Sequence, residues 1–179
     1  MNAAPGEAAR IAAPRAVLSF ARVNRPGFSG HDPEMQKHHL LPLALIARGT
    51  FARFFEAVDP ASELFLDYRA NGMLLPCREH QVLRLGLPLH RGPHPRYSEL
   101  VWQRVGQIER AWSAERRSKA CAARRASRMR LALLQRALRR QLLAPGRRAH
   151  LNTRDPLGQG RDFTVLDRMA KQLWAATQG

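Results

Sequence analysis

Residues 90–112 read HRGPHPRYSELVWQRVGQIERAW, in which two spaced histidines come directly before a helix signal. Pro95 suits the first turn of a helix, where a backbone N–H would have no partner in the helix. Apolar residues then follow three or four positions apart, at Tyr97, Val101, Val105, Ile108 and Trp112. That spacing is typical of an amphipathic helix. The sequence therefore predicts a helix from Pro95, with His90 and His94 just ahead of it.

A second helical pattern lies further along the chain. Its leucines recur at helical spacing, at Leu131, Leu134, Leu138 and Leu142. We expect a break near residues 118–121 and an end at Pro145-Gly146. The other faces are rich in arginine, with Arg116, Arg117, Arg124, Arg125, Arg128, Arg130, Arg136, Arg139 and Arg140. Thr164 with Asp167 resembles a capping box and predicts a last short helix.

The elements expected before residue 90 are short. Residues 43–58 carry apolar residues at mixed helical spacing, which predicts a short helix weakened by Gly49. Residues 73–75 are apolar and lie between the turn pair Asn71-Gly72 and Pro76, which predicts a short buried strand. The Leu40-Leu41 region is its expected partner. These elements indicate an α+β fold.

The chain has 179 residues and a formal net charge of +16, from 30 Lys and Arg against 14 Asp and Glu. Residues 31–94 hold seven cations and seven anions, whereas residues 95–150 hold 15 cations and three anions. This excess favours an anionic partner, and nucleic acid is the leading candidate. Contacts with its backbone fix position without reading sequence. The residues predicted to make them are Arg116, Arg117, Arg124, Arg125 and Arg128.

Composition argues against several classes of protein. Cys77 and Cys121 are the two cysteines of the chain, too few for a disulfide framework or a four-cysteine zinc site. The longest apolar run, residues 40–47, falls far short of the roughly 20 residues that span a bilayer, so we expect no membrane insertion. The N-terminus has no apolar stretch of signal-peptide length. We therefore expect a cytoplasmic protein, or one exported by a signal-peptide-independent route.

Four of the seven histidines occur in two short blocks. The pair His38-His39 precedes Leu-Leu-Pro, and His90 and His94 flank Arg-Gly-Pro. A nuclease that works at neutral pH needs a divalent ion to neutralise the phosphate and a base to deprotonate water. Imidazole suits both roles, because its ordinary pKa of about 6.5 leaves much of it neutral at pH 7. Neighbouring side chains of an extended segment point to opposite sides, so one of the pair could bind metal and the other face substrate only if the backbone bends.

Three blocks together resemble the AHH type of the HNH/endonuclease VII superfamily of ββα-metal nucleases, a type found in bacterial polymorphic toxins. The blocks are KHHLLP at residues 37–42, ANGMLLP at residues 70–76 and HRGPHPRY at residues 90–97. With Val101 in the following helix, the resemblance covers roughly residues 37–108. The chain departs from the family name at Lys37, where that name records alanine.

The resemblance implies a small ββα-metal core, treble-clef-like and of the His-Me finger kind, with a long Arg-rich helical extension. It implies that His38, His90 and His94 bind one divalent metal ion, which is Mg, Mn or Zn. His39 would be the general base, and Asn71 would orient it. The implied activity is that of a metal-dependent endonuclease that hydrolyses phosphodiester bonds of nucleic acid, with DNA favoured. A bacterial toxin effector of this kind would also have an immunity protein as partner.

Two alternatives stay open. His80 lies nine residues after Asn71, where many HNH enzymes place a histidine, so Cys77 and His80 compete for the site with His90 and His94. The protein could instead be a catalytically inactive nucleic-acid-binding module of the same fold.

The chain divides into four expected parts. Residues 1–30 are rich in Ala, Pro, Gly and Arg without periodicity, which predicts a flexible N-terminal tail. Residues 31–112 would form the nuclease domain, and residues 113–144 the basic helical extension. Residues 145–179 would form a linker and the short C-terminal helix.

Overall fold

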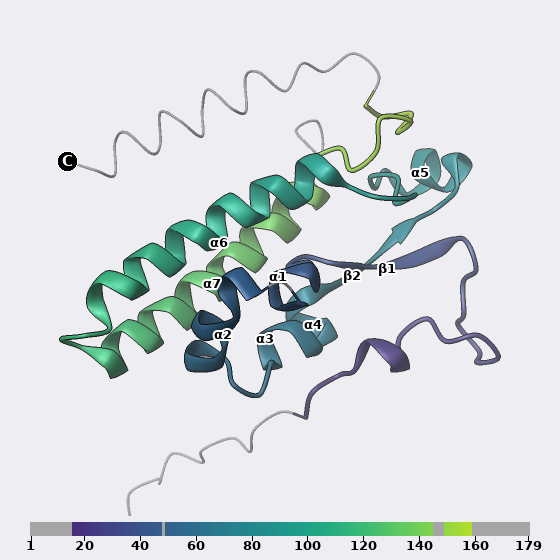
Figure 1. Cartoon of the computed structure of the whole chain (residues 1–179). Coiled ribbons are helices and arrows are strands. Elements are labelled where there is room, and N and C mark those ends of the chain that lie inside the picture. The colour runs from purple at the N-terminus through teal and green to yellow at the C-terminus, as the bar shows by residue number, and fades with distance from the viewer. Residues whose placement is uncertain (1–15, 48, 145–148, 159–179) are drawn as a thin grey trace, which may run out of the picture.

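Figure 1 shows the computed structural model of the chain, which describes residues 16–47, 49–144 and 149–158. The elements in chain order are η1 (Phe20–Arg22), β1 (Met35–His39), α1 (Ala44–Ala47), η2 (Gly49–Phe51), α2 (Ala52–Val58), α3 (Glu63–Leu66), α4 (Tyr68–Asn71), β2 (Gly72–Pro76), α5 (Glu79–Leu85), α6 (Pro95–Glu115) and α7 (Ala120–Leu143). None of the helices in this described part combines the length and the apolar character that crossing a bilayer requires.

A two-stranded antiparallel sheet carries the histidine pair. β1 pairs with β2 in a register that places His38 opposite Met73. The strand predicted over residues 73–75 is confirmed, but its partner is β1 rather than the Leu40-Leu41 region. Leu40 and Leu41 follow β1 directly and are fully buried, so they contribute to the core instead of to the strand pairing.

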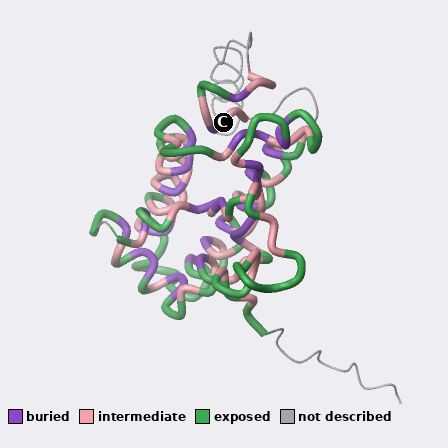
Figure 2. The backbone as a smooth tube through the Cα atoms, turned by 90° about the vertical axis from the view of Figure 1, so that its right-hand side faces the viewer, coloured by how far each residue is buried: buried purple, intermediate pink, exposed green. Residues whose placement is uncertain are grey.

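α6 and α7 form an antiparallel helical hairpin, joined by residues 116–119 (Figure 1). The helix predicted from Pro95 and the break predicted near residues 118–121 are both confirmed. The short helices α2 and α4 pack against α7. Figure 2 shows buried residues along the inner sides of the elements and exposed residues on the outer loops.

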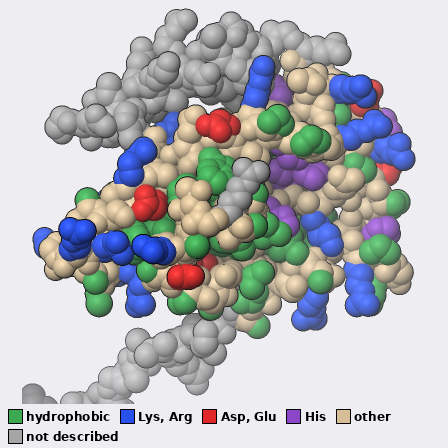
Figure 3. Space-filling view, in the orientation of Figure 1, with side chains coloured by type: hydrophobic (Ala, Val, Ile, Leu, Met, Phe, Trp, Pro, Cys, Tyr) green, Lys and Arg blue, Asp and Glu red, His purple; other side chains and the backbone are tan. Residues whose placement is uncertain are grey.

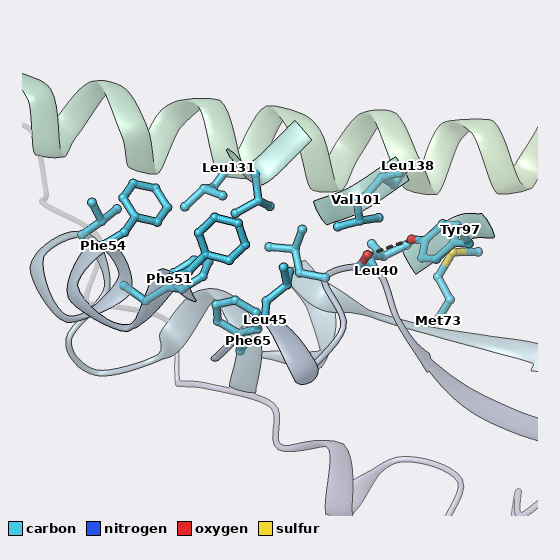
Figure 4. Close-up of a cluster of buried hydrophobic side chains, with 14 of the residues drawn as sticks. Leu40, Leu45, Phe51, Phe54, Phe65, Met73, Tyr97, Val101, Leu131 and Leu138 are labelled. Atoms are coloured by element: carbon cyan, nitrogen blue, oxygen red, sulfur yellow. Dashed lines mark hydrogen bonds between the residues drawn. The ribbon is translucent and has the colours of Figure 1, made fainter. Parts of the chain in front are cut away.

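One hydrophobic cluster joins the hairpin to the rest of the protein. Leu131 and Leu138 of α7 and Val101 of α6 lie in it with Phe54 of α2 and Phe65 of α3 (Figure 4). The basic extension expected over residues 113–144 is therefore part of the folded body. One face of α7 is buried and mostly apolar, and most of its arginines are exposed on the other faces.

Residues 16–30 also pack on the body, which differs from the flexible tail expected over residues 1–30. Phe20 stacks on His39, with ring centroids 3.9 Å apart and an interplanar angle of 7°. The first 15 residues, and the C-terminal helix expected from Thr164, lie outside the described residues.

Two local predictions differ from the structure. The single helix expected over residues 43–58 is divided into α1, η2 and α2, and η2 begins at Gly49. Gly72 does not form a turn, since its backbone is extended with φ −109° and ψ 150°. A Cβ at Gly72 would lie 2.1 Å from Cδ2 of Tyr68. Close approach of the tyrosine ring, and not a turn, therefore requires glycine at this position.

Candidate metal centre

Three histidines from two segments of the chain meet beside the sheet. His38 comes from β1, His90 from the loop between α5 and α6, and His94 from the position directly before α6. Their ligand nitrogens all lie within 4.8 Å of one another. The ring of His38 is 5.0 Å from that of His90 and 5.5 Å from that of His94, measured between centroids.

The local structure explains why these rings converge. Side chains two positions apart share a face of a strand, so Gln36 and His38 lie on the same face of β1. Oε1 of Gln36 is 3.2 Å from Nδ1 of His90. The backbone N–H of His90 donates to the carbonyl of Pro76 at 2.7 Å, which ties the loop to the end of β2. The sheet therefore places His38 and His90 together.

Burial keeps the three imidazoles neutral. His38 is 3% exposed, and its Nε2 has no hydrogen-bond partner among the described residues. Burial, followed by the nearby His90 and His94, lowers the pKa of His38 to about 3. Burial lowers the pKa of His90 to about 4, and it also lowers that of His94. All three rings therefore offer a lone pair at pH 7.

These properties fit a divalent metal ion. A buried nitrogen that lacks a partner is costly, and a cation held by three imidazoles would supply the partner of His38. Three neutral nitrogen ligands that leave further positions open are typical of catalytic zinc sites. The donor set therefore fits a divalent metal ion.

Hydrogen bonds indicate which ring nitrogen of His90 and of His94 is free. Nδ1 of His94 lies 3.3 Å from the carbonyl oxygen of Leu151, which can only accept, so this nitrogen carries the proton. Nδ1 of His90 is bonded in the same way to the amide oxygen of Gln36. Nε2 of each ring is then free to bind an ion, as in many metal sites whose non-ligating ring nitrogen is hydrogen-bonded.

His39 has different surroundings. Its half-buried ring is stacked on Phe20, whose carbonyl oxygen accepts a hydrogen bond from Nζ of Lys37 at 3.1 Å. Burial, followed by the charge of Lys37, lowers the pKa of His39. His39 also lies close enough to His90 for its charge to lower the pKa of that ring. His39 is thus a neutral imidazole near the three-histidine group and outside it.

Asn71 is fully buried at the end of α4 and acts on the backbone. Its Oδ1 accepts from the N–H of Leu41 at 2.7 Å, and its Nδ2 donates to the carbonyl of Leu41 at 3.1 Å. Nε2 of Gln135, from α7, donates to the same Oδ1 at 3.2 Å. The resemblance implied that Asn71 orients His39. In the structure the side chain of Asn71 bonds instead to the backbone of Leu41, two residues after His39.

His80 lies apart from the three-histidine group. Its exposed ring has Nε2 2.9 Å from Oε2 of Glu34. Sγ of Cys77 lies 3.7 Å from the carbonyl of Pro33. Among the described residues, the His, Cys, Asp or Glu group whose spacing suits a metal ion comprises His38, His90 and His94. The structure thus does not bring Cys77 and His80 to that group.

The arginines predicted to bind nucleic acid are of two kinds. Four are exposed at the α6–α7 turn or at the start of α7, and we call them the tip arginines: Arg116, Arg117, Arg124 and Arg125. Figure 3 shows Lys and Arg side chains gathered at this end of the molecule. Arg128 instead forms ion pairs with Asp59 at 2.9 Å and Glu63 at 3.2 Å.

Sequence reasoning missed Phe20 and Leu151. Phe20 lies in a segment without periodicity, so nothing in the pattern predicts its contact with His39. Leu151 contributes a backbone carbonyl, for which side-chain type gives no signal.

The comparison with protein families adds an independent observation. The model of a family described as a nuclease family of the HNH/ENDO VII superfamily with conserved AHH matches residues 19–138. No match was found among curated proteins or among solved structures. The matched stretch includes all three histidines of the group as well as His39 and Asn71. Since it makes up well over half of the 179 residues, the chain belongs to the AHH nuclease family of the HNH/ENDO VII superfamily.

Proposed function

We propose that this nuclease is a metal-dependent endonuclease acting on DNA, in which His38, His90 and His94 hold one divalent ion and His39 is the general base. The observation that carries the proposal is the group of three neutral imidazoles with ligand nitrogens within 4.8 Å of one another. The buried Nε2 of His38, which has no partner among the described residues, supports it.

A bound divalent ion would neutralise negative charge on the phosphate and on the departing oxygen. The chain favours this because its three ligands are neutral, so they leave the charge of the ion undiminished. The hydrogen bonds from His90 to Gln36 and from His94 to Leu151 keep both rings in the orientation that binding needs.

His39 accepts the proton of the attacking water at a ring nitrogen. The lowered pKa of His39 keeps that nitrogen unprotonated at pH 7. The water oxygen bonds to phosphorus as the bond from phosphorus to the 3′ oxygen breaks, and the 3′ oxygen takes a proton from solvent. Phe20 restricts the orientation of the His39 ring, and Asn71 fixes the backbone that follows it. Positioning of this kind accounts for much of the rate enhancement in phosphoryl transfer.

The tip arginines supply affinity for the phosphate backbone in this proposal. They are exposed, and α6, which begins directly after His94, leads from the site to Arg116 and Arg117, with Arg124 and Arg125 near the start of α7. Arg128 was predicted to share this role. A phosphate contact there would compete with its ion pairs to Asp59 and Glu63, so we assign the main contribution to the other four.

The test incubates the full chain with plasmid DNA and with structured RNA, in Mg²⁺, Mn²⁺, Zn²⁺ or a chelator. We expect DNA cleavage that needs an ion and that His39→Ala slows about 10²- to 10⁴-fold. His80→Ala is the matched control, because His80 lies outside the three-histidine group, and it should cleave at the wild-type rate. Cleavage that persists in chelator would contradict the metal proposal. Cleavage of RNA and not of DNA would show that the substrate is RNA.

The catalytically inactive nucleic-acid-binding module is the alternative outcome of this test. DNA binding without cleavage in any of the ions would favour it. From the resemblance we also propose the role of a bacterial toxin effector with an immunity protein as partner, either cytoplasmic or exported without a signal peptide. Growth arrest on expression in bacteria, relieved by His39→Ala, would support the toxin role.

A further inference from the structure

Residues 149–158 pack against the loop that carries two of the three histidines, although they lie beyond residues 19–138, which the family model matches. We call them the 149–158 segment. Hydrogen bonds from this segment reach Leu89, Arg91 and His94. The contacts thus fall on the residues on either side of His90 and on His94 itself.

Asp155 forms the most buried of these contacts. It is fully buried, and its Oδ2 accepts from the N–H of Leu89 at 2.8 Å. Its Oδ1 accepts from the N–H of Leu157 at 3.0 Å, and Nδ1 of His150 lies 3.5 Å from Oδ2. A buried carboxylate is costly unless it is hydrogen-bonded, so these bonds restrict the positions it can take. Asp155 thereby fixes the residue directly before His90.

Asn152 and Leu151 hold the other end of the loop. Nδ2 of Asn152 donates to the carbonyl of Arg91, the residue after His90. The carbonyl of Leu151 accepts from Nδ1 of His94 at 3.3 Å. The side chain of Leu151 belongs to the hydrophobic core cluster, which anchors that carbonyl. The position of the His94 ring therefore depends on where this segment docks.

We propose that the 149–158 segment positions His90 and His94 for metal binding, with Asp155 and Asn152 as its positioning residues. This inference rests on the proposed function, because it takes the three histidines to share one ion. Removing such a supporting contact in a metal site typically lowers metal affinity about 10- to 100-fold.

The test uses the full chain and titrates it with Co²⁺, followed by the visible absorption of the bound ion. Asp155→Ala and Asn152→Ala should each weaken Co²⁺ binding about 10- to 100-fold and alter the absorption spectrum. Asp155→Asn keeps a side-chain oxygen for Leu89 and should recover part of the affinity. Thr153→Ala changes an exposed residue of the same segment and should match the wild type.

Thermal melting of the metal-free variants separates misplaced ligands from a lost fold. Asn152 is only half-buried, so Asn152→Ala should keep the wild-type melting temperature. If Asp155→Ala unfolds, the Co²⁺ affinity of Asn152→Ala therefore tests the positioning role of the segment. His38→Ala distinguishes the two proposals. If it loses Co²⁺ binding while Asp155→Ala and Asn152→Ala bind like the wild type, the role of the segment is overturned and the proposed function stands. If His38→Ala also binds like the wild type, the proposed metal site itself is overturned.

Discussion

His38 and His39 are neighbours in β1, yet their rings have different partners: His38 faces His90 and His94, and His39 faces Phe20. Successive side chains of a strand point to opposite faces, so these neighbours can take the two different roles that we propose for them, metal ligand and general base. The two positions should therefore fail in different ways when substituted.

We expect His38→Ala to weaken Zn²⁺ binding, because it removes a ligand. His39→Ala should bind Zn²⁺ like the wild type and cleave plasmid DNA about 10²- to 10⁴-fold more slowly, because it removes only the base. Calorimetry with Zn²⁺ and a plasmid cleavage assay on the same preparations check both. Wild-type cleavage by His39→Ala would place the base elsewhere.

Phe20 should matter for rate and not for metal binding. Its ring is parallel to that of His39 at 3.9 Å, so Phe20→Ala frees the base to rotate. We expect a fall in kcat of up to about 10²-fold, the scale of a small misplacement of a catalytic group. Phe20→Trp keeps a stacking ring and should retain most of the activity. An unchanged kcat in Phe20→Ala would show that the stack has no positioning role.

At this scale, sequence can predict what depends on side-chain type. His38, His90 and His94 were named from a resemblance carried by three sequence blocks, and the structure brings these three side chains together. The bonds of Asn71 to Leu41 could not be predicted, because they depend on how the chain folds after β1. The same limit applies to Phe20, whose partner is distant in the sequence.

At the scale of elements, the entry to β2 depends on a glycine that packing requires. We expect Gly72→Ala to lower the free energy of unfolding by about 1–3 kcal/mol, the usual cost of overpacking, because its Cβ would lie 2.1 Å from the Tyr68 ring. Urea unfolding measures this. Gly106→Ala is the matched control within α6, where the nearest atom is 3.8 Å away, and it should stabilise the helix by up to about 1 kcal/mol. Equal stability of Gly72→Ala and the wild type would mean that Tyr68 moves freely.

The α6–α7 turn should supply salt-dependent affinity. Replacing the tip arginines with Gln should weaken DNA binding and reduce the log–log salt slope by about 0.9 for each phosphate that is no longer neutralised. The weakening should be similar on unrelated sequences, since phosphate contacts carry no sequence information. Arg128 is left intact, because its ion pairs with Asp59 and Glu63 join α7 to the segment after α2.

The double variant Arg22→Gln with Arg84→Gln is the control, because both residues are exposed and lie outside the hairpin. It should alter the salt slope less than Arg116→Gln with Arg117→Gln, which removes the same charge. If the two double variants give equal salt slopes, the tip arginines are ordinary solvent-exposed residues with no special part in DNA binding.

Periodicity explains which elements were predictable. α6 has regular apolar spacing and a proline at its start, and it forms as expected. Residues 43–58 have mixed spacing, and the helix breaks where Gly49 begins η2. The partner of β2 was predicted to be the Leu40-Leu41 region and is instead β1, which ends directly before it. Apolar residues such as Leu40 and Leu41 are typical of a buried strand, but here they lie in the core after the strand has ended.

At the scale of the whole molecule, the uneven distribution of charge predicted a nuclease domain and a separate basic extension, which the fold joins in one body. Residues 113–144 carry nine of the 27 arginines and were expected to extend from the nuclease body. Their leucines instead complete its core, and Gln135 reaches Asn71 beneath the histidine strand. Segment composition describes a surface, whereas membership of a core depends on contacts between distant residues. The docking of residues 149–158 could not be predicted for the same reason.

The length of α6 has a consequence for the substrate. This helix has 21 residues, with His94 directly before it and Arg116 directly after it. At about 1.5 Å per residue its ends are about 30 Å apart, which is about nine base pairs of duplex at about 3.4 Å each. A duplex of about six base pairs can then reach the metal centre or the tip arginines, but not both. We expect kcat/KM to rise steeply as duplex length passes about one helical turn, and to lose this threshold when the tip arginines are replaced. A kcat/KM that rises smoothly with length in both proteins would mean that the two ends of α6 do not share one substrate.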